Sequence, residues 1–356
     1  MKNSRTKFYL ILGLLFLSLN SFSQLYGGIE IGSKGVKISI LDVDNIRKGK
    51  YEIKSFWSEN VGIAKGIAID GNLADEDIDK AVAVVLTNYT KIKDEYKIND
   101  ENIFVVGSSG VAMAKNTSDL TEKIFLVTKK KLEFIDVQTE AKMLLKGCVP
   151  PIDYINSMVL DIGGGNTKGG YVDVGNNENF VFFPVSLNYG SITLTEAVNN
   201  RVLKKNDLGE YNEKSFTFLP VLREQINAMY ATAPMALEKE KIFMSGGAVW
   251  AFYTLSNGIA KQPFSEFKLE DVIYYDAILK NNFKKFETLA ETDEEAKKVL
   301  KVYSQKHLIS GSNILLASLE ALPNLDSKKL YFAKDGQIAW LVSYIAERSR
   351  RVKKID

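Results

Sequence analysis

The sequence predicts an α/β protein made of two halves that face each other across a cleft, and three observations support this. Predicted strands alternate with segments of helical periodicity, which is typical of α/β domains. A strand that ends in a carboxylate and turns through glycines occurs twice, at residues 29–35 and 160–168. The length of 356 residues is sufficient for two domains that each have a core.

The second of these hairpins, residues 158–172, has the more pronounced pattern. A short apolar run leads into Asp161, three consecutive glycines (Gly163, Gly164 and Gly165) follow, and a second strand begins after them. Consecutive glycines let the backbone adopt φ > 0 and let a ligand approach closely, and their amides can form an anion-binding concavity. We therefore expect a phosphate site here, with Asp161 holding a metal-bound water. A hairpin whose glycines only make the turn is the structural alternative.

The first hairpin, residues 27–43, repeats this design. A strand ends in Glu30, a turn spans residues 32–35, and an alternating strand follows at 36–41. The other elements expected in this half are strands at 51–57, 103–107 and 132–137, a small-residue turn at 107–110, and helices at 73–96, near 111–115 and at 139–145.

The pattern restarts after a break at residues 148–151, where the two prolines stand. The polar stretch 204–214 is expected to be a surface loop. Beyond the second hairpin, the expected elements are strands at 180–185, 241–248 (ending in a glycine turn) and 329–333, and helices at 192–202, 220–229, 234–238, 267–286, 294–305, 310–322 and 336–348.

The N-terminus has the pattern of a secretory signal peptide. Three basic residues within positions 2–7 precede an apolar run at 8–19, and a cleavage site is predicted between Ser23 and Gln24. The run is shorter than the ~20 residues that a spanning helix needs, so no membrane span is expected after cleavage. We expect an exported protein of the periplasm or cell envelope. An uncleaved leader, giving a cytoplasmic or membrane-tethered protein, is the alternative.

The formal charge of +2 comes from the N-terminal segment. Residues 1–23 hold three basic and no acidic residues, so the remainder has 43 basic against 44 acidic residues. No specific nucleic-acid binding is therefore expected. The basic tail at 348–354 is interpreted as a solvated helix end, with a polyanion site as the alternative. Cys148 is the only cysteine, which excludes an intrachain disulfide and a thiolate metal cluster. His307 is the only histidine, and we interpret it as structural.

Taken in order, the motifs resemble the exopolyphosphatase/guanosine pentaphosphate phosphohydrolase (Ppx/GppA) family of the actin-like ATPase and sugar-kinase superfamily. The family motif Asp-Ile-Gly-Gly-Gly-Ser-Thr-Glu is similar to residues 161–168, and the first motif is similar to residues 30–33, with Glu30 where the family usually has Asp. The segment Ala-Thr-Ser-Ala-Val-Arg-Glu-Ala resembles residues 107–114, and the Glu-Glu-Ala helix start resembles residues 139–141. Further similarities lie at residues 187–195, 244–248, 310–316 and 332–340.

The resemblance implies a fold of two actin-like (ribonuclease H-like) domains that face each other across a cleft. With a signal peptide at 1–23, domain I would span 24–153 and domain II would span 154–334. The C-terminal helix at 335–356 would pack back on domain I.

The departures from the family pattern lie where the chemistry is expected. The family arginine is replaced by Ala112, which removes a bidentate phosphate clamp. The first Glu of the Glu-Glu-Ala motif is Thr139, and the Glu that ends the second hairpin motif is Lys168. An ammonium at position 168 cannot hold a cation, but it can contact a phosphate. These changes indicate either an altered, less metal-dependent site or a catalytically silent relative.

In an active site, the resemblance implies hydrolysis of a terminal phosphoanhydride, which needs positioning and charge neutralisation above all. Glu140 would orient or deprotonate the attacking water. Glu30 and Asp161 would hold Mg²⁺, or alternatively Mn²⁺, through waters, so Asp161 has both a catalytic and a metal role. A helix-start carboxylate for Glu140 and solvated lysines at positions 34 and 168 are the structural alternatives. The phosphate-binding residues would be Gly32, Ser33, Lys34, Ser109, Gly163, Gly164, Gly165, Asn166, Thr167 and Lys168.

The leading hypothesis is an exported exopolyphosphatase-like phosphohydrolase that releases terminal phosphate from polyphosphate or another phosphorylated small molecule or polymer. Export argues against an ATP-dependent kinase and against guanosine pentaphosphate as the substrate, because ATP and guanosine pentaphosphate are both cytoplasmic nucleotides. The alternative from another class is a catalytically silent envelope protein that binds a phosphorylated ligand or a protein partner. The sequence leaves the oligomeric state open, a homodimer included.

Overall fold

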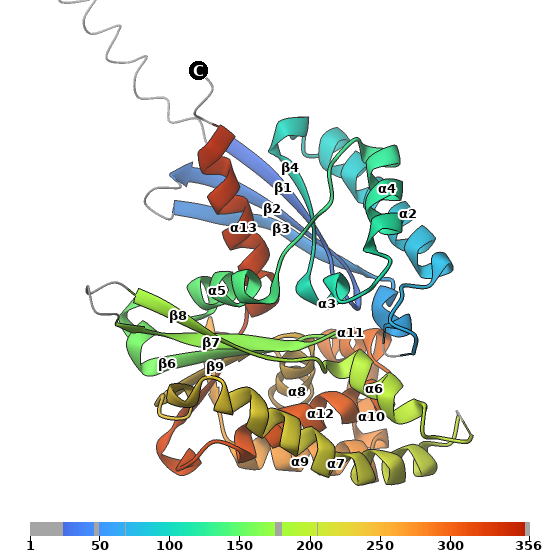
Figure 1. Cartoon of the computed structure of the whole chain (residues 1–356), viewed down its shortest axis with the longest axis vertical. Coiled ribbons are helices and arrows are strands. Elements are labelled where there is room, and N and C mark those ends of the chain that lie inside the picture. The colour runs from blue at the N-terminus through green and yellow to red at the C-terminus, as the bar shows by residue number, and fades with distance from the viewer. Residues whose placement is uncertain (1–23, 46–49, 68, 175–179, 205, 353–356) are drawn as a thin grey trace, which may run out of the picture.

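The computed structural model describes residues 24–45, 50–67, 69–174, 180–204 and 206–352. The predicted signal peptide at 1–23 and the end of the basic tail lie outside these residues. The described chain forms two α/β domains, drawn one above the other in Figure 1, and each has its own sheet. The predicted fold class is confirmed. No helix in the described ranges is both long and apolar enough to cross a bilayer.

The first sheet has five strands in the order β3-β2-β1-β4-β5. β1 pairs antiparallel with β2 and parallel with β4. Two adjacent glycines of β1 face helices on opposite sides of the sheet, since a Cβ on Gly27 would meet Ile92 of α2 and one on Gly28 would meet Ile345 of α13. The elements are β1 (Gln24–Ile31), β2 (Gly35–Asn45), β3 (Lys50–Asn60), α2 (Asp75–Asp94), β4 (Ile103–Gly107), α3 (Ser109–Ala112), α4 (Thr117–Thr128), β5 (Glu133–Phe134) and α5 (Val137–Cys148).

The second sheet has six strands in the order β10-β11-β9-β6-β7-β8. β6 is central, antiparallel to β7 and parallel to β9, and all six of its residues are buried. The elements are β6 (Ser157–Ile162), β7 (Thr167–Val174), β8 (Phe180–Leu187), α6 (Ser191–Asn199), α7 (Leu208–Ala231), β9 (Lys241–Ser245), α8 (Gly247–Asn257), β10 (Phe264–Phe267), α9 (Leu269–Asn281), α10 (Lys284–Thr292), α11 (Glu294–Val302), α12 (Gln305–Glu320), β11 (Lys329–Ala333) and α13 (Gly336–Val352).

Helices α5 and α13 lie against each other between the two sheets (Figure 1). They pack so closely that a Cβ on Gly147 would come within 2.6 Å of the Ala339 Cβ. The buried cluster around them takes side chains from both domains, including Val106 from β4 and Phe243 from β9. The two domains therefore share a core beneath the cleft, and α13 lies against β1 and β2 of the first domain.

The prediction of a surface loop at residues 204–214 is wrong, because α7 begins at Leu208. Asp207 caps the helix by accepting a hydrogen bond from the amide of Glu210 (3.0 Å). The helix then continues through Pro220, since Phe218 and Leu222 on its inner face are buried against the second sheet and its neighbours. Packing of this face outweighs the helix-breaking tendency of an internal proline.

Other boundaries also differ from the sequence expectation. Residues 267–286 do not form one helix, because Phe267 ends β10, α9 stops at Asn281, and α10 begins at Lys284. Helix α4 was not expected, and the strand expected at 132–137 is reduced to the two residues of β5. Hydrophobic periodicity alone did not separate these short neighbouring elements.

Candidate functional site

Both glycine turns close in the same way. The amide of Gly32 donates to the carbonyl of Gly35 (2.9 Å), and the amide of Gly163 donates to the carbonyl of Asn166 (3.1 Å). Each turn joins the central strand of its sheet to the next strand, so both turns lie at the same end of their domains. The two turns are therefore equivalent structures in their two domains.

The carboxylate before each turn pairs with a lysine after it. In the antiparallel register, Glu30 stands opposite Lys37, and Asp161 stands opposite Lys168. Both pairs form ion pairs with an N···O distance of 3.2 Å. A carboxylate and a lysine seven residues apart thus face each other across both hairpins.

The tips of the two hairpins touch across the boundary between the domains. A Cβ on Gly165 would lie 2.2 Å from the Oγ of Ser33, and a Cβ on Gly110 would lie 2.6 Å from the same oxygen. Side chains at these two positions would push the first hairpin away from the second hairpin and from α3. Glycine is needed here for close approach of the chain to itself, in addition to any approach by a ligand.

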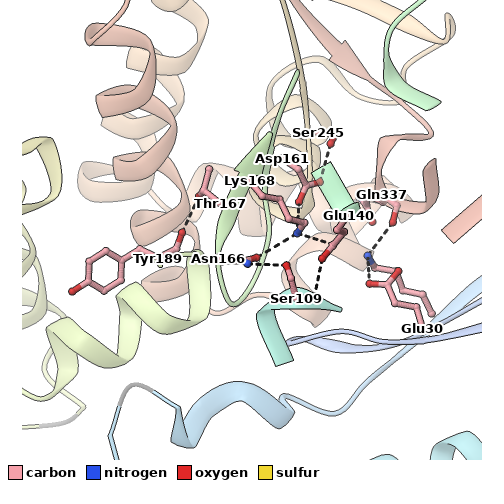
Figure 2. Close-up of polar contacts among 11 residues, drawn as sticks. Glu30, Ser109, Glu140, Asp161, Asn166, Thr167, Lys168, Tyr189, Ser245 and Gln337 are labelled. Atoms are coloured by element: carbon pink, nitrogen blue, oxygen red, sulfur yellow. Dashed lines mark hydrogen bonds and ion pairs between the residues drawn. The ribbon is translucent and has the colours of Figure 1, made fainter. Parts of the chain in front are cut away.

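Lys168 lies at the centre of a buried polar cluster (Figure 2). Its Nζ is 3.0 Å from Glu140 Oε1, 3.2 Å from Asp161 Oδ1 and 3.4 Å from Asn166 Oδ1. Burial disfavours the charged form of the lysine, but Glu140 and Asp161 outweigh this, so the pKa of Lys168 is raised above its usual value. The expected alternative of a solvated lysine at 168 is wrong, because only 6% of the side chain is exposed.

Glu140 reaches this cluster from the first turn of α5. Asp136 caps that helix by accepting a hydrogen bond from the Thr139 amide (2.8 Å). The Oε2 atom of Glu140 accepts a hydrogen bond from the amide of Ser109 (2.8 Å), at the start of α3, and Asn166 Nδ2 donates to Ser109 Oγ (2.9 Å). The carboxylate therefore lies at a helix start, as the structural alternative supposed, but it faces α3 and also pairs with Lys168.

The ion pair of the first hairpin lies nearer to solvent. Lys37 is 27% exposed and also donates to the carbonyl of Gln337 in α13 (2.9 Å). Glu30 is buried, and its Oε2 atom has no hydrogen-bond partner among the described residues. Burial raises the pKa of Glu30, and the nearby Glu140 raises it further, against the lowering effect of Lys37.

A cavity of about 910 Å³ opens between the domains beside these groups. Six lysines line it: Lys34, Lys37, Lys168, Lys298, Lys301 and Lys334. The side chain of Thr167 instead donates to the Tyr189 carbonyl (2.8 Å), and Ser109 does not line the cavity. The predicted site residues that do line it are Glu30, Gly32, Ser33, Lys34, Glu140, Asp161, Gly163, Gly164, Gly165, Asn166 and Lys168.

Lys34, at the tip of the first hairpin, is a lysine of the cavity with a lowered pKa. Burial and the nearby Lys65 lower the pKa of Lys34 to about 8. Its Nζ lies 5.3 Å from the ring centroid of Tyr303, and it has no ion pair among the described residues. Burial, Lys34 and Lys65 together lower the pKa of His307 to about 3, so that imidazole stays neutral at physiological pH. His307 Nδ1 lies 3.0 Å from Ser304 Oγ at the start of α12.

Sequence reasoning missed three residues of this site. Lys37 could have been found from its spacing to Glu30, which equals the spacing between Asp161 and Lys168. Ser245 donates to Asp161 Oδ2 (2.8 Å) because parallel pairing of β9 with β6 sets the two residues side by side. Tyr303 packs on the glycine turn after β9, where a Cβ on Gly247 would lie 1.8 Å from its hydroxyl. Only knowledge of the tertiary structure would have revealed the last two.

The fold is that of the two-domain actin-like class. An exopolyphosphatase-like protein superposes with a TM-score of 0.71 at 16% identity, covering 91% of this chain and 99% of that one. An exopolyphosphatase from Cytophaga hutchinsonii gives 0.67 at 18% identity, covering 90% and 98%. A Ppx/GppA phosphatase from Aquifex aeolicus gives 0.59 at 18% identity, covering 90% and 99%. At these identities the likeness shows the fold alone.

The chain belongs to the Ppx/GppA phosphatase family, whose family model matches residues 43–328. It is 28% identical over 196 residues to a bifunctional 3-dehydroquinate synthase/phosphatase of Fusobacterium nucleatum, covering 54% of this chain and 28% of that protein. It is 26% identical over 181 residues to a guanosine-5'-triphosphate,3'-diphosphate pyrophosphatase of Pseudoalteromonas atlantica, covering 51% and 34%. The matched regions span about a third of the length of these curated relatives.

Phosphatases of this family generally depend on a divalent metal, so the carboxylates must be tested for a fit. Within the described ranges, no group of three or more His, Cys, Asp or Glu side chains could hold a metal ion. Mg²⁺ binds oxygens at ~2.0–2.1 Å in octahedral geometry. Here the Glu140 and Asp161 carboxylates are already occupied by the Lys168 ammonium, and Glu30 is paired with Lys37. In this arrangement the residues do not fit a divalent metal.

Proposed function

We propose that this protein is a phosphohydrolase that removes the terminal phosphate from polyphosphate or from a related phosphoanhydride. The observation that carries the proposal is the cavity between the domains, where both glycine turns, one buried acid at a helix start and six lysines meet. Phosphoryl transfer requires positioning and charge neutralisation, and backbone amides and ammonium groups supply both. Membership of the Ppx/GppA phosphatase family supports the reaction class.

Glu140 is the residue of the cleft best suited to act on water. A carboxylate can accept about four hydrogen bonds; one oxygen of Glu140 accepts from the Ser109 amide, and the other forms an ion pair with Lys168 and has no hydrogen-bond donor among the described residues. Remaining lone pairs can accept a hydrogen bond from water. That water attacks the terminal phosphorus and gives its proton to Glu140, the bridging P–O bond breaks, and the shortened chain leaves as the new anion. Asp161 positions Lys168, which in turn faces Glu140.

The surroundings of the third glycine turn support an inorganic chain as the substrate. The Tyr303 ring packs directly on Gly247, and Trp250 lies beside it with ring centroids 6.4 Å apart. The Tyr303 ring takes the space directly beside Gly247, and both rings line the cavity next to the turn, where the resemblance would place a nucleoside. A chain of phosphates has no such bulky group and can follow the lysines of the cavity.

The cellular location is part of the proposal. The signal-peptide pattern at 1–23 supports an exported protein of the periplasm or cell envelope. Sequencing the N-terminus of the native protein tests this. A chain that starts at Gln24 agrees with export, whereas a chain that starts at Met1 contradicts it.

Phosphate release from polyphosphate by the purified mature chain tests the activity. Wild type is expected to release phosphate, and Glu140→Gln to lose roughly 10²–10⁴-fold in rate, which is the usual contribution of a general base. Asp161→Asn is expected to lose activity as well. The matched control is Glu122→Gln, which changes an exposed residue of α4 outside the cavity and should leave the rate unchanged.

The second candidate function is a non-catalytic protein that binds a phosphorylated ligand or a partner. Two observations favour it: Ala112 stands where the family has an arginine, and Lys168 occupies the carboxylates of the cleft. If wild type releases no more phosphate than Glu140→Gln yet still binds polyphosphate, the enzyme hypothesis fails and this one stands.

A further inference from the structure

The Lys168 ammonium has the surroundings of a bound cation. Three oxygens from three residues lie 3.0–3.4 Å from its Nζ, and an ammonium has three N–H donors. The side chain is buried, and the Gly163 turn lies against it, since a Cβ there would be 3.5 Å from Nζ. The group is thus held in one position by oxygens from both domains, through hydrogen bonds to Asp161 and Asn166 and an ion pair with Glu140.

The first hairpin carries a second ammonium in the equivalent position. Lys37 pairs with Glu30 as Lys168 pairs with Asp161, at the same distance of 3.2 Å. The three carboxylates of the cleft, Glu30, Glu140 and Asp161, are therefore faced by two fixed positive charges. A divalent ion would bring the same charge of +2 to the same oxygens.

We propose that Lys168, supported by Lys37, is a resident cation that takes the place of a divalent metal, so that the cleft binds a phosphoanhydride chain without added metal. This deepens the proposed function and rests on it for the identity of the ligand. A metal ion could reach Glu140 and Asp161 only by displacing a buried ammonium of like charge, for which no partner would remain.

In this proposal Lys168 is a positioning residue. Because its ammonium is surrounded by Glu140, Asp161 and Asn166, it lowers the negative charge of the cleft and holds Glu140 in place by an ion pair without touching the phosphate. Direct contacts to the phosphate fall to the amides of the two turns and to Lys34. A positioning role of this kind predicts that a change of Lys168 alters metal binding. A change of a lysine that only stabilises the fold would leave metal binding unaltered.

The first experiment uses wild type with inorganic tripolyphosphate as the probe and follows the melting temperature. Tripolyphosphate is expected to raise the melting temperature equally in EDTA and in Mg²⁺, and Mn²⁺ alone is expected to leave it unchanged. Titration of Mn²⁺ followed by electron paramagnetic resonance should show no tight site. Loss of the tripolyphosphate effect in EDTA, or one tightly bound Mn²⁺ per chain that perturbs the cleft, would overturn the proposal.

The second experiment changes the ammonium into a ligand. Lys168→Glu places a third carboxylate beside Glu140 and Asp161, so this variant is expected to bind one Mn²⁺ and to gain about 4 °C in melting temperature from it. The matched control is Lys241→Glu, which breaks the 2.6 Å ion pair with Asp153 outside the cavity and should bind no Mn²⁺. A folded Lys168→Glu variant that does not bind Mn²⁺ contradicts the proposal.

Three further outcomes distinguish failure of the resident cation from failure of the proposed hydrolysis. If Lys168→Glu does not fold even with Mn²⁺, the wild-type measurements in EDTA decide the matter. If wild type binds tripolyphosphate without metal but releases no phosphate, the resident cation stands and the proposed hydrolysis fails. If wild type hydrolyses polyphosphate only with Mg²⁺ or Mn²⁺, the hydrolysis stands and the resident cation is rejected.

Discussion

The two glycine hairpins have the same design and different surroundings. Each has a carboxylate, a four-residue turn and a lysine opposite the carboxylate, with the same ion-pair distance. Lys37 stays 27% exposed at the rim of the cleft, whereas Lys168 is 6% exposed and meets a second acid from the other domain. One motif therefore serves as a partly solvated ion pair in the first hairpin and as a buried junction between domains in the second.

Removing each lysine is the strongest test of this comparison. Lys168→Met leaves Glu140 and Asp161 buried without an opposing charge, and we expect the free energy of unfolding to fall by about 3–5 kcal/mol. Lys37→Met should lower it by about 1–2 kcal/mol, because its ion pair is partly exposed and Glu30 can take up a proton. Urea unfolding followed by circular dichroism measures both variants.

The control for these measurements is Lys280→Met, which removes a partly exposed helical ion pair with Asp276 (2.7 Å). It should lower the free energy of unfolding by no more than about 1 kcal/mol. Equal losses for Lys37→Met and Lys168→Met would show that the surroundings of the two hairpins do not matter, and the comparison would fail.

The sequence was a good guide to the hairpins because their signals are local. A strand, an acid and a glycine turn occupy consecutive residues, and the same pattern in Glu30 and Asp161 indicated two domains. The family resemblance rests on the same local motifs, and the match over residues 43–328 confirms it. Assignment of individual site residues to phosphate, metal or catalysis stays a prediction.

Contacts between distant segments could not be predicted from the sequence. Nothing local shows that Lys168 would be buried, because its acid partner Glu140 comes from a different domain and a different type of element. The start of α7 at Leu208 depends in the same way on packing of Tyr211 and Phe218 against residues far along the chain. Where packing decides between a solvated and a buried side chain, local composition has little predictive value.

Replacing the carboxylates, instead of the lysines, tests the same difference between the two hairpins. Because burial raises the folded-state pKa of Glu30 above its usual 4.5, the native state binds the proton more tightly than the unfolded chain. Stability therefore falls as pH rises from about 4.5 through the folded-state pKa. Glu30→Gln removes this loss, so its melting temperature relative to wild type should increase between pH 4 and pH 7.

Asp161→Asn should instead destabilise the folded chain. It takes a carboxylate away from the buried Lys168, and we expect a loss of about 2 kcal/mol at neutral pH. Melting temperatures of wild type and both variants across this pH range measure the contrast. A Glu30→Gln curve parallel to that of wild type would contradict the assignment of a buried, partly unpaired carboxylate to the first hairpin.

The turn of the first hairpin differs from the second in carrying Lys34 where the second has Gly165, and this gives the smallest predicted effect. Burial and then Lys65 lower the pKa of Lys34 to about 8, so the ammonium is charged below that pH and loses its proton above it. Tripolyphosphate affinity should therefore be full below about pH 8 and fall about 10-fold by pH 10, the loss expected for one charged contact. Without ligand the sign is reversed, because the unfolded chain holds the proton up to about pH 10.5, and stability gains from Lys34 as pH rises from about 8.

Calorimetric titration of tripolyphosphate at several pH values tests this, with Lys34→Arg and Lys34→Gln for comparison. Arginine keeps its charge throughout this range, so Lys34→Arg should bind with little change from pH 7 to pH 10. Lys34→Gln should bind about 10-fold more weakly than wild type at pH 7 and match it near pH 10, because deprotonated lysine and glutamine both lack the charge. If wild type keeps its full affinity up to pH 10, the turn of the first hairpin holds no titrating contact to the ligand, and the anion is bound by backbone amides and the other lysines of the cavity.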